Sequence, residues 1–472
     1  MNNFSTQQWA EETFGRSNLG DPRRTKRLVE YARSQADAPT ASTFGSCEGD
    51  IAASEGAYRF LRNHAVDPKS IDTGVALSVI EQCKGYKLLL SIQDTASVEV
   101  AHSSLRKELV EEGNPTGFLV HSTLMVEAES GFPLGLIDQA RWTRPKDRAS
   151  KNKNGTEVRR KYIEKESYRW ETASRHMVEM MGDVSNVITV CDREGDVYEF
   201  LQYHQEHALR YIVRAAQNRR LAEGTSLWKA MEQMPILGYR VVQIEQRGPW
   251  KPACEKKREG RQARETTLEI RGGQTKLLWP KKDKPESAAV VTVNVVYVRE
   301  VEPVEGHEQL TWRLLTTEPV ETLEAADFVV SCYEKRWVIE EFHKSWKVGC
   351  RLEERPLQSL KAVERFMAIS ASIGVRLLQF QCIARVDPDA PCDRLLTTEE
   401  WQCLYAISNP RKPLPAKPPA LSWAYYTIAK MGGWMDTKRN GRVGWQSVWK
   451  GWRRFQDRLE GWRIARGAYV SH

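Results

Sequence analysis

The chain has 472 residues, of which 41% are hydrophobic and 28% charged, and its formal net charge is +8. These values are typical of a soluble protein with two or three domains. The N-terminus has no signal-like apolar segment and no run of 18 apolar residues occurs, which predicts a cytoplasmic protein that does not enter a membrane. Nine Cys without a C-x-x-C pair indicate reduced, packed thiols rather than a zinc site or disulfides.

Residues 1–67 are predicted to form a helical domain with two basic helices. Asp21 is a predicted N-cap and Pro22 a first helical residue. A second basic helix follows at about residues 55–63. Such a unit is a plausible DNA reader, but solvated basic helix faces are equally common, and these residues alone leave both readings open. The candidate DNA contacts are Arg23, Arg24, Arg27, Arg59 and Arg62.

From about residue 86 the pattern becomes one of alternating strands and helices. Two apolar strands, 87–94 and 186–192, each end in a carboxylate, that of Asp94 and that of Asp192. Three strands in a meander, followed by helix, strand, helix and strand, predict an α/β (α+β) fold with a mixed sheet. The other elements predicted here are strands 118–128, 133–142 and 210–214 and helices 160–182 and 196–208.

The remaining chain divides into three parts. Residues 216–315 are predicted to be a β-rich insertion, so that the sheet domain spans 68–385 and ends with helix 360–383. A proline-rich linker at 409–420 lies within a helical C-terminal domain, 386–472. Apolar residues recur there at helical spacing, and we expect them to be partly local core and partly a dimer interface. They are Trp445, Val448, Trp449, Trp452, Phe455, Leu459 and Trp462.

Residues 333–347 are predicted to form one helix with two different sides. At 100° per residue, one stripe collects a carboxylate with groups that favour an anion. Such a stripe suits a metal-binding carboxylate flanked by phosphate clamps. The stripe contains Tyr333, Arg336, Glu340, Lys344 and Lys347, and the predicted apolar side contains Phe328, Val338, Ile339, Phe342 and Trp346.

Asp94 and Asp192 are candidate metal ligands because each comes at a strand end. Neighbouring strand ends bring such groups together, and two carboxylates repel each other unless a cation joins them. Mg²⁺ prefers oxygen ligands, and two metals about 4 Å apart can stabilise an in-line phosphoryl displacement. Glu340 can close such a site. For either Asp alone, a turn or N-cap role is the more common explanation.

These motifs resemble those of the DDE transposases of the IS-four family, and the resemblance extends along nearly the whole chain. The most specific pattern is Y-(2)-R-(3)-E-(6)-K, which Tyr333, Arg336, Glu340 and Lys347 meet. Further family-like segments are Glu55-Gly-Ala-Tyr-Arg-Phe60, Asp94-Thr95, Val190-Cys-Asp-Arg-Glu194, 316–320 and 429–433. The sequence departs from the family at Gln93, where an acid is common, and at 351–359.

The resemblance implies a ribonuclease H-like fold in which Asp94, Asp192 and Glu340 bind two Mg²⁺ ions, with Mn²⁺ as a substitute. It also implies that Trp312 stacks on a flipped base, although core packing is the ordinary role of such a residue. The implied phosphate and DNA contacts are Tyr333, Arg336, Lys344, Lys347 and Arg214.

The function that follows is cut-and-paste DNA transposition in a bacterial cytoplasm. Cleavage at a transposon end would form a hairpin, and strand transfer into target DNA would follow, with a homodimer holding two ends. Two alternatives remain. One is a DNA-binding regulator with an inactive nuclease domain, and the other is a nuclease that cuts without joining.

Overall fold

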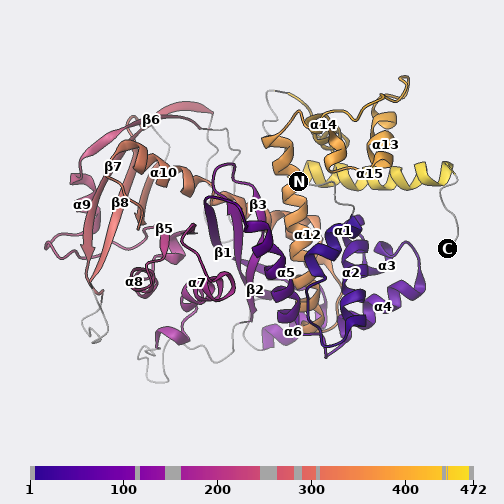
Figure 1. Cartoon of the computed structure of the whole chain (residues 1–472), viewed down its shortest axis with the longest axis horizontal. Helices are drawn as coiled ribbons and strands as arrows, with labels where there is room; N and C mark the ends of the chain where they lie inside the picture. The colour runs from indigo at the N-terminus through magenta and orange to yellow at the C-terminus, as the bar shows by residue number, and fades with distance from the viewer. Residues whose placement is uncertain are drawn as a thin grey trace. The chain divides into compact units, whose positions relative to one another are not determined.

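The computed structural model describes residues 6–111, 117–143, 161–244, 263–280, 290–303, 309–437, 443 and 445–466. Two compact units make up the chain (Figure 1). The first unit contains Met1–Tyr86, Thr95–Val158 and Val338–His472, and the second contains Lys87–Asp94 and Arg159–Trp337.

One mixed sheet of nine strands has the order β3-β2-β1-β4-β5-β9-β8-β7-β6. β1 pairs in parallel with β4, and β4 pairs in parallel with β5. The antiparallel pairs are β2–β3, β5–β9, β9–β8, β8–β7 and β7–β6. This topology confirms the predicted mixed, ribonuclease H-like sheet. The strands are β1 (Leu89–Glu99), β2 (Gly117–Glu127), β3 (Pro133–Trp142), β4 (Val187–Cys191), β5 (Arg210–Arg214), β6 (Ile236–Ile244), β7 (Arg264–Leu277), β8 (Val291–Glu300) and β9 (Thr311–Thr316).

The predicted insertion is β-rich, and its strands extend the same sheet beyond β5 through β9. β8 shows how its sequence produces this. Val291, Val293 and Val295 alternate along the strand and are all buried, in a core that includes Tyr211 and Leu315. The helices of the second unit are α7 (Tyr168–Met181), α8 (Tyr198–Glu206), α9 (Leu227–Gln233) and α10 (Leu323–Glu334), with 3₁₀ turns η1 (Tyr162–Glu164) and η2 (Arg193–Gly195).

The N-terminal helices begin where the sequence places acidic caps. The Asp21 side chain accepts a hydrogen bond from the Arg23 N–H at 2.9 Å, and Pro22 is the first helical residue, as predicted. Asp50 and Asp67 cap the next two long helices in the same way. The helices are α1 (Thr6–Phe14), α2 (Pro22–Asp37), α3 (Thr43–Ser46), α4 (Ile51–Arg62), α5 (Pro68–Cys83) and α6 (Ser103–Glu111).

Two buried arginines connect these helices to the later part of the first unit. Arg355 donates to the carbonyls of Pro39 (2.8 Å), Ala41 and Cys350, and Arg365 donates to the carbonyls of Leu61 and Val66. Both guanidinium groups therefore satisfy carbonyls near helix ends that would otherwise lack donors.

The C-terminal part of the first unit is helical, as predicted. Val448, Phe455 and Leu459 of the last helix are buried in a local core, and Trp452 and Trp462 pack against it. The side chains of Trp445 and Trp449 lie outside the described residues. The elements are α11 (Trp337–Lys344), the π turn η3 (Ser345–Gly349), η4 (Leu352–Glu354), α12 (Leu360–Val386), η5 (Cys392–Arg394), α13 (Thr398–Ser408), α14 (Leu421–Met431) and α15 (Trp445–Ala465).

Among the described residues, one helix passes a length-and-composition test for a membrane span, namely Leu360–Ala384 of α12. Of its most apolar window, 78% is buried inside the structure. This is the pattern of a core helix, so the result is weak evidence for a membrane.

The prediction of a single helix over 333–347 is wrong. α10 ends at Glu334, residues 335–336 form a turn in which the Arg336 N–H bonds the Tyr333 carbonyl at 3.0 Å, and α11 starts at Trp337. The predicted apolar side is correct for Ile339, Phe342 and Trp346, which are fully buried, but Phe328 is 37% exposed.

The π turn at the end of α11 also departs from the predicted helix. Ser345 donates to the Gly374 carbonyl at 2.9 Å, and the Trp346 indole donates to the Ser370 hydroxyl at 2.9 Å. Both consecutive side chains thus bond α12 from within the π turn. A Cβ on Gly374 would lie 2.8 Å from the Trp346 Cβ, so the close approach requires glycine.

Candidate active site

Asp94 and Asp192 lie on adjacent parallel strands of the second unit. Gln93 and Cys191 are register partners on β1 and β4, and each Asp is the next residue. Asp192 follows the end of β4 as predicted, but Asp94 is not at a strand end, because β1 continues to Glu99. Only the pairing of β1 with β4 ends before Asp94.

The electrostatics of Asp192 show that the two carboxyl groups interact. Burial raises the pKa of Asp192 to about 6, and the charge of Asp94 adds to the increase. The Glu194 N–H, which donates to Asp192 Oδ1 at 2.8 Å, and the charge of Arg336 act in the opposite direction. Asp192 therefore also caps η2, so the cap role and the coupled acid role apply to one residue.

This pair has the chemistry of a partial divalent-cation site. Both groups offer hard carboxylate oxygens, and the raised pKa of Asp192 reflects a charge that its surroundings do not fully compensate. A divalent cation supplies such compensation, so the residues present fit a bound Mg²⁺ ion.

A cluster of aromatic and guanidinium groups belongs to the same unit. The rings of Trp312 (β9) and Tyr333 (α10) make an edge contact with centroids 5.7 Å apart. The Arg336 guanidinium lies 5.9 Å from the Tyr333 ring and 5.4 Å from the Trp337 ring. Arg214 Nη2 donates to the Thr311 carbonyl at 3.2 Å. Four predicted DNA contacts thus come together here.

The charge of Asp192 acts on Tyr333 of this cluster. Burial raises the pKa of Tyr333, and the charge of Asp192 adds to it, while Arg336 and Arg214 oppose it. Burial lowers the pKa of Arg214, and the neighbouring charges of Arg193 and Arg336 add to that decrease. The cluster therefore concentrates positive charge beside two carboxylates, as a site that holds a phosphate needs.

Arg193 acts electrostatically on this cluster, although it was not among the predicted DNA contacts. It is exposed, it follows Asp192 directly, and its charge acts on Arg214. The sequence placed it within the family-like segment Val190-Cys-Asp-Arg-Glu194, which gave Arg193 no role of its own.

Glu340 belongs to the first unit, on α11, and its side chain is partly buried. Among the described residues, no group of three or more His, Cys, Asp or Glu side chains is arranged to hold a metal ion. The convergence of Glu340 with the two Asp residues therefore stays a prediction. Lys344 is exposed, and Lys347 Nζ lies 3.3 Å from Glu353 Oε1.

The five N-terminal arginines project from α2 and α4 with differing freedom. The side chains of Arg23 and Arg59 are 91% and 81% exposed, although each pairs with a nearby acid on its own segment. Arg27 pairs with Glu30. Arg24 donates to the Leu19 carbonyl, and Arg62 lies over the Tyr58 ring. Geometry alone does not separate a DNA-binding surface from solvated helix faces.

Comparison with known proteins decides the family. Residues 132–373 match the model of the Transposase DDE domain, residues 6–66 match Transposase DNA-binding, and residues 372–471 match the Transposase Tn5 dimerisation domain. The DDE match covers more than half of the chain, which therefore belongs to the DDE transposases. The dimerisation match makes it similar to the Tn5 transposase in particular.

One solved structure is a distant match to the whole chain. It is a cryo-EM structure of the piggyBac transposase synaptic complex with hairpin DNA, with a TM-score of 0.36 and 9% sequence identity. The match covers 98% of this chain and 79% of the piggyBac chain. A likeness at this level supports no further conclusion.

Proposed function

We propose that this transposase cuts DNA at transposon ends through a hairpin intermediate and joins the freed ends to target DNA. In this proposal Asp94, Asp192 and Glu340 hold two Mg²⁺ ions. The observation that carries it is the pair of interacting, partly buried acids beside the cluster of Trp312, Tyr333, Arg336 and Arg214.

Alternation along two strands supports Glu340 as the third ligand. Thr95 Oγ1 on β1 lies 2.9 Å from His121 Nδ1 on β2, so these two side chains share one face of the sheet. Neighbours along a strand point to opposite faces. Asp94 precedes Thr95, and Ser122 follows His121, so we expect Asp94 and Ser122 to share the other face.

The second step leads from Ser122 to the helix of Glu340. Ser122 Oγ lies 3.3 Å from His343 Nε2, and His343 is three residues after Glu340 on α11. The helix of Glu340 is therefore in contact with β2 within the first unit. The role of Glu340 as the third ligand is the part of the proposal that the cleavage test below addresses.

The side chains around the acids have distinct proposed tasks. When bound, divalent cations supply Lewis-acid stabilisation of charge on the reacting phosphate. Arg336 and Arg214 would bind phosphate oxygens, and Tyr333 would donate its hydroxyl. Lys344 and Lys347 would add positive charge along the backbone of the same DNA strand. Trp312 would stack on a base that leaves the duplex, a contact worth about 1–3 kcal/mol.

We propose a homodimer on DNA, because cut-and-paste chemistry needs two ends held together. Support comes from the dimerisation match and from apolar side chains that remain exposed in the same C-terminal part of the chain. Tyr426, Met435 and Ile464 are 45%, 64% and 61% exposed. The five N-terminal arginines are the proposed end-binding surface, supported by the DNA-binding match.

The test uses a duplex that carries the inverted repeat flanking the gene, with Mg²⁺ and a target plasmid. We expect wild-type protein to nick, form a hairpin and join. Glu340→Gln, Asp94→Asn and Asp192→Asn should each abolish cutting while binding of the duplex persists. Retained cutting by Glu340→Gln would remove Glu340 from the site. If the wild-type protein cuts the duplex without joining it to the target, the protein is a nuclease. If it binds the duplex without cutting it, the protein is a DNA-binding regulator.

A further inference from the structure

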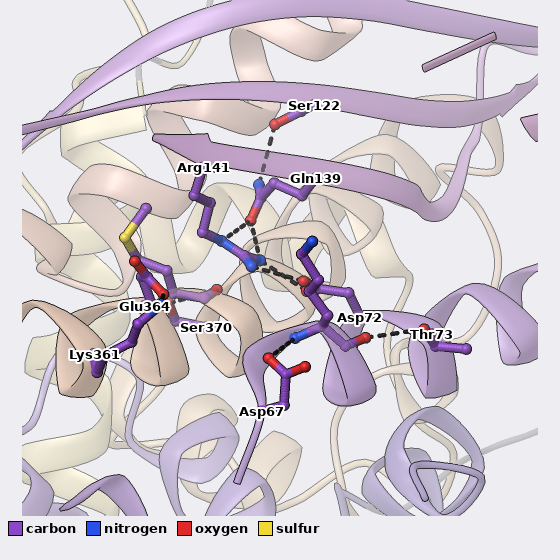
Figure 2. Close-up of polar contacts among 11 residues, drawn as sticks. Asp67, Asp72, Thr73, Ser122, Gln139, Arg141, Lys361, Glu364 and Ser370 are labelled. Carbon is purple, nitrogen blue, oxygen red and sulfur yellow. Dashed lines mark hydrogen bonds and ion pairs between the residues drawn. The ribbon is translucent and has the colours of Figure 1, made fainter. Parts of the chain in front are cut away.

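A chain of five polar side chains crosses the first unit from α5 to α11. Figure 2 shows its part from Asp72 through Arg141 and Gln139 to Ser122, and His343 follows Ser122. Gln139 and His343 are each 6% exposed, Ser122 is not exposed, and the Arg141 side chain is 5% exposed. Buried polar groups of this kind are costly unless they are paired, so their arrangement has to be consistent from end to end.

The first half of the chain has only one possible direction. Arg141 donates through Nη1 and Nη2 to both oxygens of Asp72, at 2.7 and 2.8 Å. It also donates through Nε and Nη2 to Gln139 Oε1, at 3.1 and 2.7 Å. Because a guanidinium group only donates, the amide oxygen of Gln139 has to face Arg141. The amide nitrogen of Gln139 therefore faces Ser122 Oγ, at 3.1 Å.

Continuing the same direction makes the Ser122 hydroxyl the donor to the imidazole of His343, whose tautomer sets the roles in this bond. Ser122 Oγ accepts from the Gln139 amide, which leaves the serine hydroxyl proton available for donation. His343 Nε2, 3.3 Å away, is its partner. In this arrangement Nε2 accepts a hydrogen bond and the imidazole proton is on Nδ1.

We propose that His343 is a positioning residue that fixes the rotation of α11 and thereby the direction of Glu340. This inference rests on the proposed function of Glu340 as a metal ligand. α11 has only eight residues, with the turn 335–336 before it and the π turn after it, so its own ladder of hydrogen bonds is short. Phe342 and Ile339 supply apolar contacts, which are not directional. The bond to Ser122 adds a directional contact from within α11, in addition to those that Ser345 and Trp346 make with α12 just after it.

Substitutions at three positions test this network of polar side chains. Ser122→Ala removes the donor to His343. His343→Gln offers Oε1 as a replacement acceptor near the place of Nε2, whereas His343→Leu offers none. Ser54→Ala is the matched control, because it removes another buried serine hydroxyl, one that donates to the Asp50 carbonyl at the start of α4.

Single-turnover cleavage of the inverted-repeat duplex at saturating DNA is the first readout, with duplex affinity measured separately. We expect Ser122→Ala to slow cleavage by about 10-fold and His343→Leu by about 50-fold, with affinity unchanged within about 2-fold. The cleavage rate of His343→Gln should stay within about 5-fold of the wild-type rate. The cleavage rate of Ser54→Ala should equal the wild-type rate. Ser122→Ala in the His343→Leu background should cause no further loss, because both act on one contact.

The second readout does not depend on activity. In protein labelled with ¹⁵N-histidine, the His343 signals, assigned with His343→Gln, should show a proton on Nδ1. Ser122→Ala should change this pattern and Ser54→Ala should not.

The outcomes separate the two proposals. A wild-type protein that binds the duplex and does not cut it overturns the proposed function and, with it, the positioning role. Wild-type cutting together with unchanged cutting by Ser122→Ala, or with a proton on Nε2 of His343, overturns only the positioning role.

Discussion

Asp94 raises the pKa of Asp192, because the two residues follow register partners on adjacent parallel strands. Burial is the larger cause, and together they bring the pKa of Asp192 to about 6 from a usual 3.8. Below about pH 4 this carboxyl group is protonated in both folded and unfolded chains and has no effect on stability. As the pH rises toward 6, only the unfolded chain ionises, so the folded state loses up to about 3 kcal/mol, and the loss persists above pH 6.

Asp192→Asn should therefore stabilise the metal-free protein while abolishing cleavage. The expected gain is about 1–3 kcal/mol at pH 8 and falls toward zero as the pH approaches 4. Thermal unfolding in EDTA at several pH values measures it. Asp183→Asn is the control, because hydrogen bonds to Ser185 lower the pKa of exposed Asp183 and its loss should not stabilise the protein. A destabilised Asp192→Asn protein at pH 8 would contradict the described environment.

Arg336 should matter for DNA phosphate and not for the cation. Its guanidinium lies over both Tyr333 and Trp337, a planar arrangement that lysine does not reproduce. We expect Arg336→Ala to slow hairpin formation by about 100-fold and Arg336→Lys by about 10-fold, with the Mg²⁺ dependence of the remaining activity unchanged. Equal losses of hairpin formation and Mg²⁺ affinity would count against a phosphate role.

His204 should make the second unit sensitive to acid. It is fully buried on α8, its Nδ1 lies 2.9 Å from the Phe200 carbonyl, and burial lowers its pKa to about 4 from 6.5. The unfolded chain binds a proton first as the pH falls from about 6.5, so stability falls by up to about 3 kcal/mol by pH 4. His204→Phe should flatten this dependence in urea titrations at pH 5 and 7.5. His207→Gln, at an exposed position just after the same helix, should not.

Arg355 should be among the most sensitive structural positions of the first unit. Replacement by methionine leaves three carbonyls without their donor and should cost about 3–5 kcal/mol. We expect faster proteolysis near residues 38–42 in Arg355→Met. Limited proteolysis with peptide mapping of the fragments measures it. Arg351→Met is the comparison, because the Arg351 side chain is 42% exposed and pairs with nearby Glu354. Equal proteolysis of the two variants would contradict this assignment.

Local sequence patterns predict many helices and strands of this fold. Buried apolar runs predicted β4 and β5, and the Asp21-Pro22 pair predicted the start of α2, because each depends on residues within one element. The position of Asp192 followed from the same kind of pattern, because it comes directly after the buried strand β4. Asp94 lies near it because β1 pairs in parallel with β4 up to Gln93, and not because a strand ends there.

What sequence did not predict depends on contacts between distant segments. The break at 335–336 and the π turn follow from how Ser345 and Trp346 bond α12, and no local periodicity encodes that. β1 continues past Asp94 although its polar residues suggested an end. Arg193 was overlooked because a charged residue after an N-cap has no distinctive pattern until Arg214 is found close to it.

The buried guanidinium of Arg355 has a consequence for biosynthesis. Its partners Pro39 and Ala41 precede it by 316 and 314 residues, so a nascent chain exposes the loop after α2 long before the donor leaves the ribosome. Until then, water or a chaperone has to satisfy those carbonyls. A translation product that stops short of residue 355 would lack the contact of Arg355 with the loop after α2. We expect host proteases to degrade such a product faster than the full chain.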